Sequence, residues 1–526
     1  MSGPPALRDG GAIPLSGDDR VRVGPSRPLF TLGEIAAWTG ARPGAGGLAP
    51  TAVITGVEVD SRQVRPGDLF CALPGERVDG HSFVGRALEA GALAALVARD
   101  PGCPVPSGRQ LLEVPDVREA LGQLARHHRD RYAIPVIGVT GSVGKTTTKD
   151  LIASALGSAL RVLANRGNLN TDIGLPLSLF ELGPEHEIVC LEMSMRGPGE
   201  VARLAALARP SSGVITNVGP AHIEWLGSLQ AIATAKEELL WALPPDGSAV
   251  LNADDPIVSA MAPRHRGRLA RVVTYGLDRP ADVSAAGLDP ASEAGARFVV
   301  TAFGTELGPF TVPLAGKHSV LNALAAVAVA LLHGVNPEAI RSGLARPRLS
   351  GLRQEVTAVG GVTVVNDAYN AGPASMAASV ELLVAWRARR GGRAVAVLGD
   401  MLELGGLSEA AHRDLGRALA RAGIDHLIAV GPLSAVLSEA ARQGGLGEDR
   451  VRHFSGQPGA GNPEAAEAAL RAVRPGDTVL VKASRGMKFE EIADRLVSGL
   501  RDRAEGRAAE DKAAEGRAAE DKAAEE

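Results

Sequence analysis

The stretch that most constrains the fold is VIGVTGSVGKTTTKD, residues 136–150. An apolar run leads into a loop containing Gly141 and Gly144, which Lys145 and three threonines follow. Glycines let successive backbone N–H groups face a phosphate, and a helix starting at Gly144–Lys145 directs its positive end at the same group. A strict P-loop sequence has glycine where this chain has Val139, so the consensus motif is not matched. The glycines, the lysine and the helix start that bind phosphate are nevertheless present. We expect a strand, a phosphate-binding loop and a helix in that order; a Gly-rich turn with a surface lysine is the alternative.

The length and charge of the chain limit its class. A chain of 526 residues exceeds what one hydrophobic core usually supports, so we expect roughly two to four domains. With 56 basic and 60 acidic residues the net charge is −4, which gives no strong attraction for nucleic acid or an anionic membrane. Three scattered cysteines, Cys71, Cys103 and Cys190, imply neither a disulfide framework nor a CxxC metal site. The N-terminus has no apolar signal segment, and the longest apolar run, Val320–Leu332, is too short to cross a bilayer. The sequence predicts a cytoplasmic protein that binds no nucleic acid and does not insert into a membrane.

Short apolar runs alternate with amphipathic helices through most of the chain, which is typical of parallel sheets covered on both faces. The expected fold class is α/β, with three domains at 29–130, 131–348 and 349–500. Residues 1–28 are rich in Gly, Pro and charge, and we predict that they are disordered. EGRAAEDKAA occurs at 505–514 and again at 515–524, so residues 501–526 are predicted to be a solvated, charged tail without a chemical role.

The expected strands follow from the apolar runs. In the first domain they are Ala52–Val59, Leu69–Leu73 and Ala94–Val97, with Ser82 and Asp116 as helix N-caps. In the central domain they are Pro135–Val139, Ile188–Glu192, Gly213–Asn217 and Ala249–Asn252. In the last domain they are Thr363–Asn366, Arg393–Leu398, His426–Val430 and Asp477–Val481.

A P-loop enzyme also needs an acidic side chain near the metal, at the end of a neighbouring strand. HEIVCLEMS supplies Glu192 at the tip of such a strand, although a strand-ending acid can also be a solvated turn. Lys145 can reach the β- and γ-phosphates, and the Thr146 hydroxyl can bind Mg²⁺. Thr146 and Glu192 are therefore candidate metal ligands.

These motifs together resemble the Mur ligase family of peptidoglycan synthesis. Besides TGSVGKTT (140–147) and the Glu192 strand, the matching stretches are TNVGPAHIEWLGS (216–228), ATAKEELL (233–240), LNADDP (251–256), GKHSVLNALAAVAVA (316–330), GLRQEV (351–356) and VVNDAYNAGPASM (364–376). The resemblance covers residues 29–500, in order. It implies a small N-terminal domain for a UDP-linked substrate, a central P-loop ATPase domain and a C-terminal Rossmann-like domain for the amino substrate.

Within the family, NDAYNAGP, LGDMLELG (398–405) and VKASRGMKFE (481–490) are similar to the member that joins D-alanyl-D-alanine to UDP-N-acetylmuramoyl-tripeptide. The sister ligase that adds the third amino acid typically has TGTNGKTT and a DNPR motif, and this chain has neither. An N-terminal signature at residues 60–83 is shared by both ligases and does not separate them.

The resemblance implies that ATP phosphorylates the terminal carboxylate of the tripeptide and that the dipeptide amine attacks the acyl phosphate. Two anions must meet, so cations have to screen them. The implied ATP site comprises Gly141, Ser142, Val143, Gly144, Lys145, Thr146 and Thr147, with Asn322 at the adenine, Arg353 at the γ-phosphate and Asp367 at the ribose or the hinge. Two Mg²⁺ ions are implied, with Thr146, Glu192, His222 and a carbamylated Lys236 as ligands. The implied catalytic set is Lys145, Glu192, His222, Lys236 and Arg353.

The resemblance also assigns the two substrates. The residues for the UDP end are Asp60, Ser61, Arg62, Gly80 and His81, and those near the muramoyl group are Asn170 and Thr171. The residues placed where the dipeptide carboxylate needs a cationic or N–H partner are Asn370, Lys482, Ser484 and Arg485. The chain departs from the family pattern at Thr171, Ser194, Ser319, Gly372 and Ala483, and none of these removes a proposed charge or metal ligand. We expect a monomer whose last domain closes over the central one.

Simpler interpretations exist for single residues and for the whole chain. Taken alone, His222 is more often a capping residue, Lys236 a helix-face lysine beside Glu237, Asn322 a tolerated polar residue and Asp60 a turn residue. The rival functions are the sister ligase, a folylpolyglutamate synthase-like enzyme, a P-loop switch or motor ATPase, and a binding module without catalysis. An assay with ATP, the muramoyl tripeptide and a panel of amines would separate them.

Overall fold

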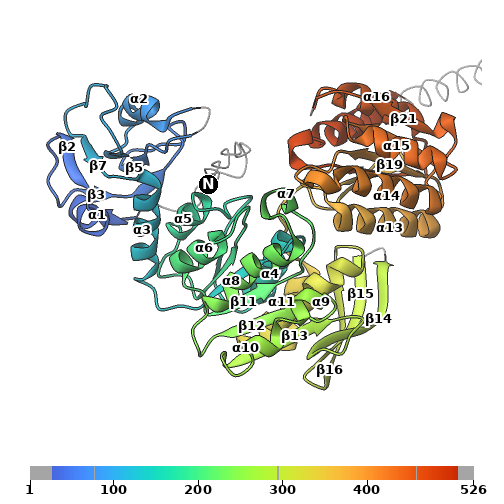
Figure 1. Cartoon of the computed structure of the whole chain (residues 1–526), viewed down its shortest axis with the longest axis horizontal. Helices are drawn as coiled ribbons and strands as arrows, with labels where there is room; N and C mark the ends of the chain where they lie inside the picture. The colour runs from blue at the N-terminus through green and yellow to red at the C-terminus, as the bar shows by residue number, and fades with distance from the viewer. Residues whose placement is uncertain (1–26, 76–77, 293–294, 458, 507–526) are drawn as a thin grey trace, which may run out of the picture.

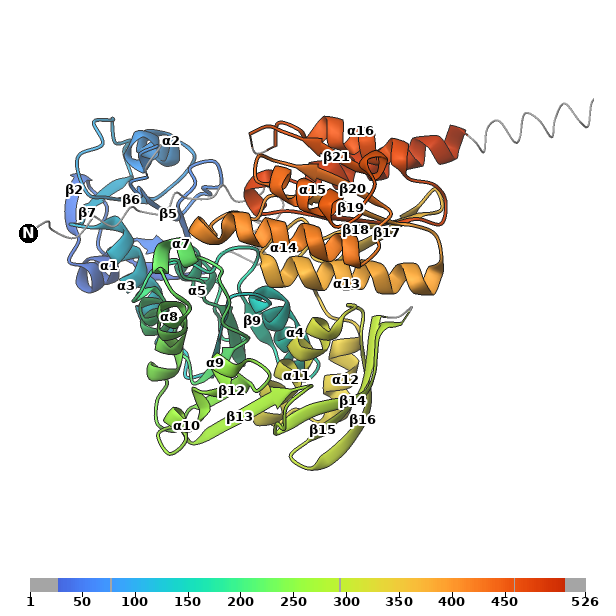
Figure 2. The same ribbon diagram turned by 45° about the vertical axis from the view of Figure 1, so that its right-hand side comes forward.

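The computed structural model describes residues 27–75, 78–292, 295–457 and 459–506. They form three α/β units, here called the N-terminal, central and C-terminal domains, which confirms the predicted fold class. The N-terminal and C-terminal domains lie on the same side of the central domain (Figure 1, Figure 2). The predicted N-terminal extension, apart from 27–28, and the duplicated tail, apart from 501–506, fall outside the described residues. Within the described ranges, no helix is long and apolar enough to span a bilayer.

The N-terminal domain has a five-stranded sheet of order β2-β7-β6-β5-β4 and a two-stranded sheet of β1 and β3. Its elements are β1 (Phe30–Thr31), α1 (Leu32–Thr39), β2 (Arg42–Gly46), β3 (Val53–Ile54), β4 (Gly56–Glu58), β5 (Asp68–Cys71), a 3₁₀ turn (Gly80–Phe83), α2 (Val84–Glu89), β6 (Ala94–Val97), β7 (Gln110–Glu113) and α3 (Val117–Arg129). Only β2 runs antiparallel to its neighbour in the larger sheet.

The predicted strands Leu69–Leu73 and Ala94–Val97 are confirmed as β5 and β6, whereas two other predictions for this domain are wrong. The run Ala52–Val59 is not one strand, because the extended conformation is interrupted at Thr55. The residues before Thr55 form β3, which pairs with β1, and those after it form β4, which pairs with β5 in the other sheet. Ser82 is not an N-cap, because Asp79, three residues earlier, accepts a hydrogen bond from the backbone N–H of His81 and caps the 3₁₀ turn that contains Ser82. Asp116 does cap α3 as predicted.

The central domain has a nine-stranded sheet of order β16-β15-β14-β13-β12-β11-β8-β10-β9. Its elements are β8 (Val136–Thr140), α4 (Lys145–Gly157), β9 (Val162–Ala164), α5 (Gly174–Leu179), β10 (Ile188–Glu192), α6 (Glu200–Ala208), β11 (Ser212–Ile215), α7 (Ile223–Leu226), α8 (Leu229–Trp241), β12 (Ser248–Asn252), α9 (Pro256–Ser259), α10 (Ala262–His265), β13 (Arg271–Gly276), β14 (Val283–Ser292), β15 (Gly295–Ala302), β16 (Thr305–Val312), α11 (Lys317–Leu332) and α12 (Pro337–Ala345).

The four predicted strands of this domain correspond to β8, β10, β11 and β12 and are parallel, as expected. The prediction missed the antiparallel extension from β14 to β16. In β15 buried and more exposed positions alternate, because only one face of this extension packs against α11. A search for continuous apolar runs does not detect such alternating strands.

The C-terminal domain has a six-stranded sheet of order β17-β18-β22-β19-β20-β21, in which only β17 is antiparallel. Its elements are β17 (Glu355–Val359), β18 (Val362–Asn366), α13 (Pro373–Arg390), β19 (Ala394–Gly399), a 3₁₀ turn (Gly405–Leu407), α14 (Ser408–Arg421), β20 (His426–Val430), α15 (Ser434–Gln443), a 3₁₀ turn (Glu448–Arg450), β21 (Val451–Phe454), α16 (Asn462–Ala472), β22 (Thr478–Lys482), a 3₁₀ turn (Arg485–Met487) and a helix over 490–506. The four predicted strands here correspond to β18, β19, β20 and β22.

The domains are joined in two different ways. One apolar core continues from the N-terminal domain into the central domain, where α3 packs against both α1 and the helices α5 and α6. The C-terminal sheet has a core on each face, and one of these cores also includes Ala291 and Ala315 of the central domain. The contacts with the central domain further include ion pairs and hydrogen bonds made by Glu403, Gln354 and Arg389. The N-terminal and central domains thus share a continuous apolar core, whereas the C-terminal domain meets the central domain through both polar groups and two buried alanines.

Candidate active site

The phosphate loop connects β8 to α4, as predicted from the sequence. Gly144 takes a left-handed conformation (φ 81°) and directly precedes the first residue of the helix, Lys145. Gly141 lies so close to Thr216, the residue after β11, that an added Cβ would overlap the Thr216 hydroxyl. Lys145 Nζ donates to the Gly141 carbonyl at 3.0 Å. The loop is therefore narrow, and a cation lies over its backbone.

The segment after β11 holds this loop in place. Asn217 accepts a hydrogen bond from Val143 N–H with Oδ1 at 2.9 Å and donates to the Val143 carbonyl with Nδ2 at 3.0 Å. The Ser142 N–H donates to the Asn217 carbonyl at 3.0 Å, and the Ser142 hydroxyl pairs with Gly219. Two of the N–H groups expected to bind phosphate are thus bonded within the protein. Asn217 lies in the motif 216–228 but was not among the predicted site residues.

Thr146 and Glu192 meet at the ends of α4 and β10. The Thr146 hydroxyl donates to Glu192 Oε2, and both side chains are buried. Asn170 Nδ2 donates to the other carboxylate oxygen at 2.8 Å. Asn165, which the sequence analysis missed, accepts from the Glu192 N–H at 2.9 Å and donates to its carbonyl at 3.0 Å. Since no apolar pattern or motif marks Asn165, only the fold reveals it.

This donor set suits a hard divalent cation, because Mg²⁺ prefers oxygen ligands such as hydroxyl and carboxylate groups. Thr146 and Glu192 already lie within hydrogen-bond distance of each other, so one ion could contact both. Among the described residues, no group of three or more His, Cys, Asp or Glu side chains is arranged to hold a metal. Further ligands would have to come from other side chains, from water or from substrate oxygens.

Lys236 on α8 is 1% exposed. Burial holds the pKa of its ammonium group well below the usual value, and the positive charge of Lys145 lowers this pKa further. Burial also lowers the pKa of Lys145, which the Glu192 carboxylate opposes and the Arg353 charge reinforces. Lys145 is thus close enough to Lys236 to lower its pKa, and Arg353 is close enough to Lys145 to do the same. The structure places Lys236 inside the protein and not on an exposed helix face.

His222 precedes α7 in a left-handed conformation (φ 64°) and lies at the contact with the C-terminal domain. Its Nδ1 is 2.7 Å from Oε2 of Glu403, which follows β19 and is also left-handed. This contact is the main reason that the pKa of Glu403 lies below its usual value. Arg196 approaches the same carboxylate at 3.9 Å. The sequence analysis did not assign Glu403 a role.

Asn322, on α11, lies beside the start of α4. Its Oδ1 accepts a hydrogen bond from the Thr148 hydroxyl at 3.1 Å, and a Cβ added to Gly144 would be 2.9 Å from the same atom. Thr147, in the first turn of α4, belongs to the same region. The predicted nucleotide residues of the loop and of α11 are therefore neighbours in space.

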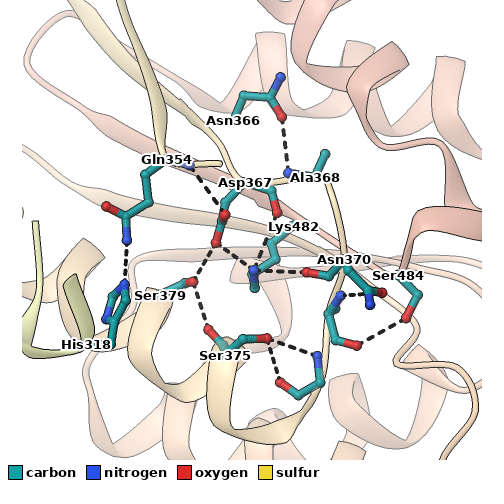
Figure 3. Close-up of polar contacts among 12 residues, drawn as sticks. His318, Gln354, Asn366, Asp367, Ala368, Asn370, Ser375, Ser379, Lys482 and Ser484 are labelled. Atoms are coloured by element: carbon teal, nitrogen blue, oxygen red, sulfur yellow. Dashed lines mark hydrogen bonds and ion pairs between the residues drawn. The ribbon is translucent and has the colours of Figure 1, made fainter. Parts of the chain in front are cut away.

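Figure 3 shows the cluster around Asp367, at the end of β18. Lys482 Nζ lies 2.6 Å from Asp367 Oδ2, and the Ser379 hydroxyl donates to the same oxygen at 2.8 Å. Gln354 links this cluster to the central domain, since its side chain contacts His318 Nε2 at 2.7 Å and accepts from Ala315 N–H at 3.2 Å. Of the two roles implied for Asp367, ribose or hinge, these contacts place it beside the interdomain linker.

The residues expected to bind the dipeptide surround this cluster. Lys482 is buried and also donates to the Asn370 carbonyl at 3.1 Å. The Ser484 hydroxyl donates to the Ala371 carbonyl at 3.3 Å, and Arg485 pairs with Glu490 at 2.8 Å. The structure brings these four predicted residues together, with Lys482 engaged inside the protein and Asn370 exposed.

The residues expected to bind the UDP end lie in the N-terminal domain. Arg62 forms a 2.7 Å ion pair with Asp60, which raises the pKa of the guanidinium, and Ser61 between them is buried. His81 is buried next to Gly80, and both of its ring nitrogens have partners, Asp79 Oδ1 at 2.7 Å and the Ala98 N–H at 2.9 Å. Because both of its ring nitrogens are bonded within the domain, His81 has a local structural role.

In the central domain, the Thr171 hydroxyl accepts from Gly174 N–H at 3.3 Å.

Comparison with known families gives three matches in consecutive parts of the chain. Residues 53–129 match the Mur ligase family catalytic domain, residues 139–330 the Mur ligase middle domain and residues 352–485 the Mur ligase glutamate ligase domain.

Individual proteins are similar over nearly the whole described chain. The UDP-N-acetylmuramoyl-tripeptide–D-alanyl-D-alanine ligase of Bacillus subtilis (strain 168) is 39% identical over 446 residues, covering 85% of this chain and 93% of that protein. A crystal structure of MurF from Acinetobacter baumannii has 31% identity and a TM-score of 0.79, covering 90% of this chain and all of that one. The MurF ligase of Thermotoga maritima in complex with ADP has 30% identity and a TM-score of 0.72, covering 85% of this chain and 98% of that one.

Proposed function

The chain belongs to the Mur ligase family, and on this basis we propose that it is the ATP-dependent ligase that joins D-alanyl-D-alanine to UDP-N-acetylmuramoyl-tripeptide. The sister ligase that adds the third amino acid is not favoured, because the similar proteins named above act with D-alanyl-D-alanine or are MurF enzymes. We infer that the reaction passes through an acyl phosphate on the tripeptide.

The observation that supports this chemistry best is the pair of cations, Lys145 and Arg353, at the phosphate loop. The Arg353 charge lowers the pKa of Lys145 and the Glu192 carboxylate raises it, and Glu192 forms a buried pair with Thr146. A peptide carboxylate and the γ-phosphate of ATP repel each other, so fixed positive charge must offset this repulsion as they approach. Lys145 and Arg353 supply that charge. The pair Thr146–Glu192 would hold Mg²⁺, which when bound would supply further charge neutralisation at the phosphates.

Lys236 needs a different role, because an ammonium group repels a metal ion. Its lowered pKa favours the neutral amine, and a neutral amine is the form that reacts with CO₂ to give a carbamate. The carbamate is an anion with oxygen donors, so it neutralises the charge of Lys145 and offers oxygens toward a second Mg²⁺, with His222 as a further ligand. We propose this modification on the burial and the lowered pKa of Lys236 together with the family resemblance.

The remaining predicted residues keep the roles that the resemblance implies. Asn322 contacts adenine, Asp60, Ser61 and Arg62 contact the UDP end, and Asn170 and Thr171 lie toward the muramoyl group. Asn370, Ser484 and Arg485 receive the dipeptide, with Lys482 supporting Asn370 through its carbonyl. Since all of these residues come from one chain, we propose that the enzyme acts as a monomer. Because it uses ATP and a UDP-linked substrate, we place it in the cytoplasm.

An amine-panel assay tests the function. The protein is incubated with ATP, Mg²⁺ and UDP-N-acetylmuramoyl-tripeptide, and phosphate release is measured with D-alanyl-D-alanine, D-alanine or no amine. A parallel series offers UDP-N-acetylmuramoyl-dipeptide with a diamino acid, the substrates of the sister ligase. We expect rapid release only with the tripeptide and D-alanyl-D-alanine. Release with the dipeptide substrate and diamino acid alone would identify the sister ligase, and equal release without any amine would indicate a plain ATPase.

A further inference from the structure

Arg353 lies in a strained part of the linker between the central and C-terminal domains. Leu352 and Gln354, on either side of it, have left-handed backbones with φ of 62° and 49°. Residues other than glycine adopt this conformation at a cost in free energy, so the surrounding structure must hold them there. The Tyr369 N–H donates to the Leu352 carbonyl at 3.2 Å, and the Gln354 N–H approaches Asp367 Oδ1 at 3.4 Å. The backbone of Arg353 is therefore fixed on both sides by the loop after β18.

The side chain of Arg353 is fixed by the same loop. Its Cζ atom lies 3.6 Å from the centroid of the Tyr369 ring. The other arginine–aromatic contacts among the described residues are longer, at 5.1–5.6 Å. At 3.6 Å the guanidinium carbon is in van der Waals contact with the ring, which combines packing with cation–π attraction.

One end of the guanidinium has no protein partner. Nη1 of Arg353 is buried, and no atom of the described chain accepts a hydrogen bond from it. A buried, unpaired N–H of a cation is costly unless an anion completes it. The charge of Arg353, and a side-chain hydrogen bond with it, lower the pKa of the Tyr369 hydroxyl, although burial outweighs them. Burial raises the pKa of the Tyr369 hydroxyl, so the ring carries no competing negative charge.

We propose that Tyr369 is a positioning residue that sets the plane of the Arg353 guanidinium, so that Nη1 points at the γ-phosphate of ATP. This inference rests on the proposed function, in which Arg353 meets that phosphate. A carboxylate could also hold an arginine, but it would take up the guanidinium N–H groups and neutralise the charge that the phosphate needs. A tyrosine ring holds the guanidinium without neutralising its charge and leaves Nη1 free.

The test compares a nucleotide that has a γ-phosphate group with one that lacks it. Dissociation constants of the full chain for the non-hydrolysable ATP analogue AMP-PNP and for ADP, both with Mg²⁺, are measured by calorimetry. Losing a desolvated cation–π contact corresponds to about a 5- to 30-fold change in an equilibrium. We expect Tyr369→Leu to weaken the affinity for AMP-PNP by about that factor and to change the affinity for ADP by less than about twofold. Tyr369→Phe keeps the ring face and should leave both affinities within about twofold.

A second comparison separates positioning from general damage. In an Arg353→Gln background there is no guanidinium to orient, so adding Tyr369→Leu should not weaken the affinity for AMP-PNP any further. The proposal is overturned if Tyr369→Leu weakens both nucleotides equally, if it weakens neither, or if its effect persists in the Arg353→Gln background. These binding measurements need no amine, so failure of the ligase assay with D-alanyl-D-alanine would refute the proposed function without altering their outcome.

Discussion

The ion pair between Lys482 and Asp367 should be one of the main supports of the C-terminal domain. The two charged atoms are 2.6 Å apart, and the side chains are 4% and 12% exposed. Replacing Lys482 with Met removes the cation and leaves the Asp367 carboxylate with the Ser379 hydroxyl and the more distant Gln354 N–H as donors. Breaking one side of a buried pair costs about 3–5 kcal/mol, mostly because the remaining charge is desolvated without compensation.

The magnitude can be converted into a measurable shift. For a domain of this size the free energy of unfolding falls by about 2 kcal/mol per M urea, so the unfolding midpoint should drop by about 1.5–2.5 M. Because the C-terminal sheet has its own cores, the loss should be confined to that domain. Hydrogen exchange followed by mass spectrometry, on peptides that cover β18 and β22, reads this domain separately from the rest.

Two controls make the reasoning refutable. Arg413→Met breaks the exposed Arg413–Glu409 pair on α14, and such helix pairs contribute only about 0.3–0.5 kcal/mol. The double variant Lys482→Met/Asp367→Asn removes both charges and should recover most of the lost stability. If Lys482→Met shifts the midpoint no more than Arg413→Met, or if the double variant is as unstable as the single one, the pair does not stabilise the domain as argued.

Two further predictions concern the lysines of the phosphate site. Lys145→Ala should lower phosphate release at least about 10²- to 10³-fold, since it removes a charge that screens the meeting anions, while calorimetry should show unchanged binding of the UDP-linked substrate in the N-terminal domain; unchanged turnover would refute the site. Lys236→Met should stabilise the protein in CO₂-free buffer. The pKa of Lys236 is lower in the folded state than in the unfolded chain, so between these two values the unfolded chain binds one proton more. Burying Lys236 therefore lowers the free energy of unfolding. This loss is full below the folded-state pKa and disappears as the pH rises to the ordinary lysine value. Thermal unfolding should therefore show a gain that is largest near neutral pH and shrinks toward about pH 10, with the exposed Lys317→Met as control; a gain equal at all pH values would contradict the argument.

The sequence predicted the parts of the site that lie directly after apolar strands. The phosphate loop after β8 and Glu192 at the end of β10 could be located because buried parallel strands appear as continuous apolar runs and end at a common edge. The pairing of Thr146 with Glu192 follows from the same geometry.

Residues whose role depends on tertiary contacts could not be found in this way. Asn165 and Asn217 each fix a functional segment through backbone hydrogen bonds from distant parts of the chain. Glu403 acquires its partner His222 only when two domains meet. Tyr369 was within a quoted motif, yet nothing in the sequence indicates that its ring lies against Arg353.

The C-terminal domain meets the central domain through polar contacts and the buried alanines Ala291 and Ala315, whereas the N-terminal and central domains share one extended apolar core. The C-terminal domain is therefore the natural unit for making chimeric ligases. A C-terminal domain from a ligase of different amine preference could be grafted after residue 348. Besides the linker around Gln354, the contacts to rebuild would include Glu403 with His222, and Arg389 with Asp289, which are 2.7 Å and 2.8 Å apart. Exchange of the N-terminal domain would instead require redesign of the packing around α3.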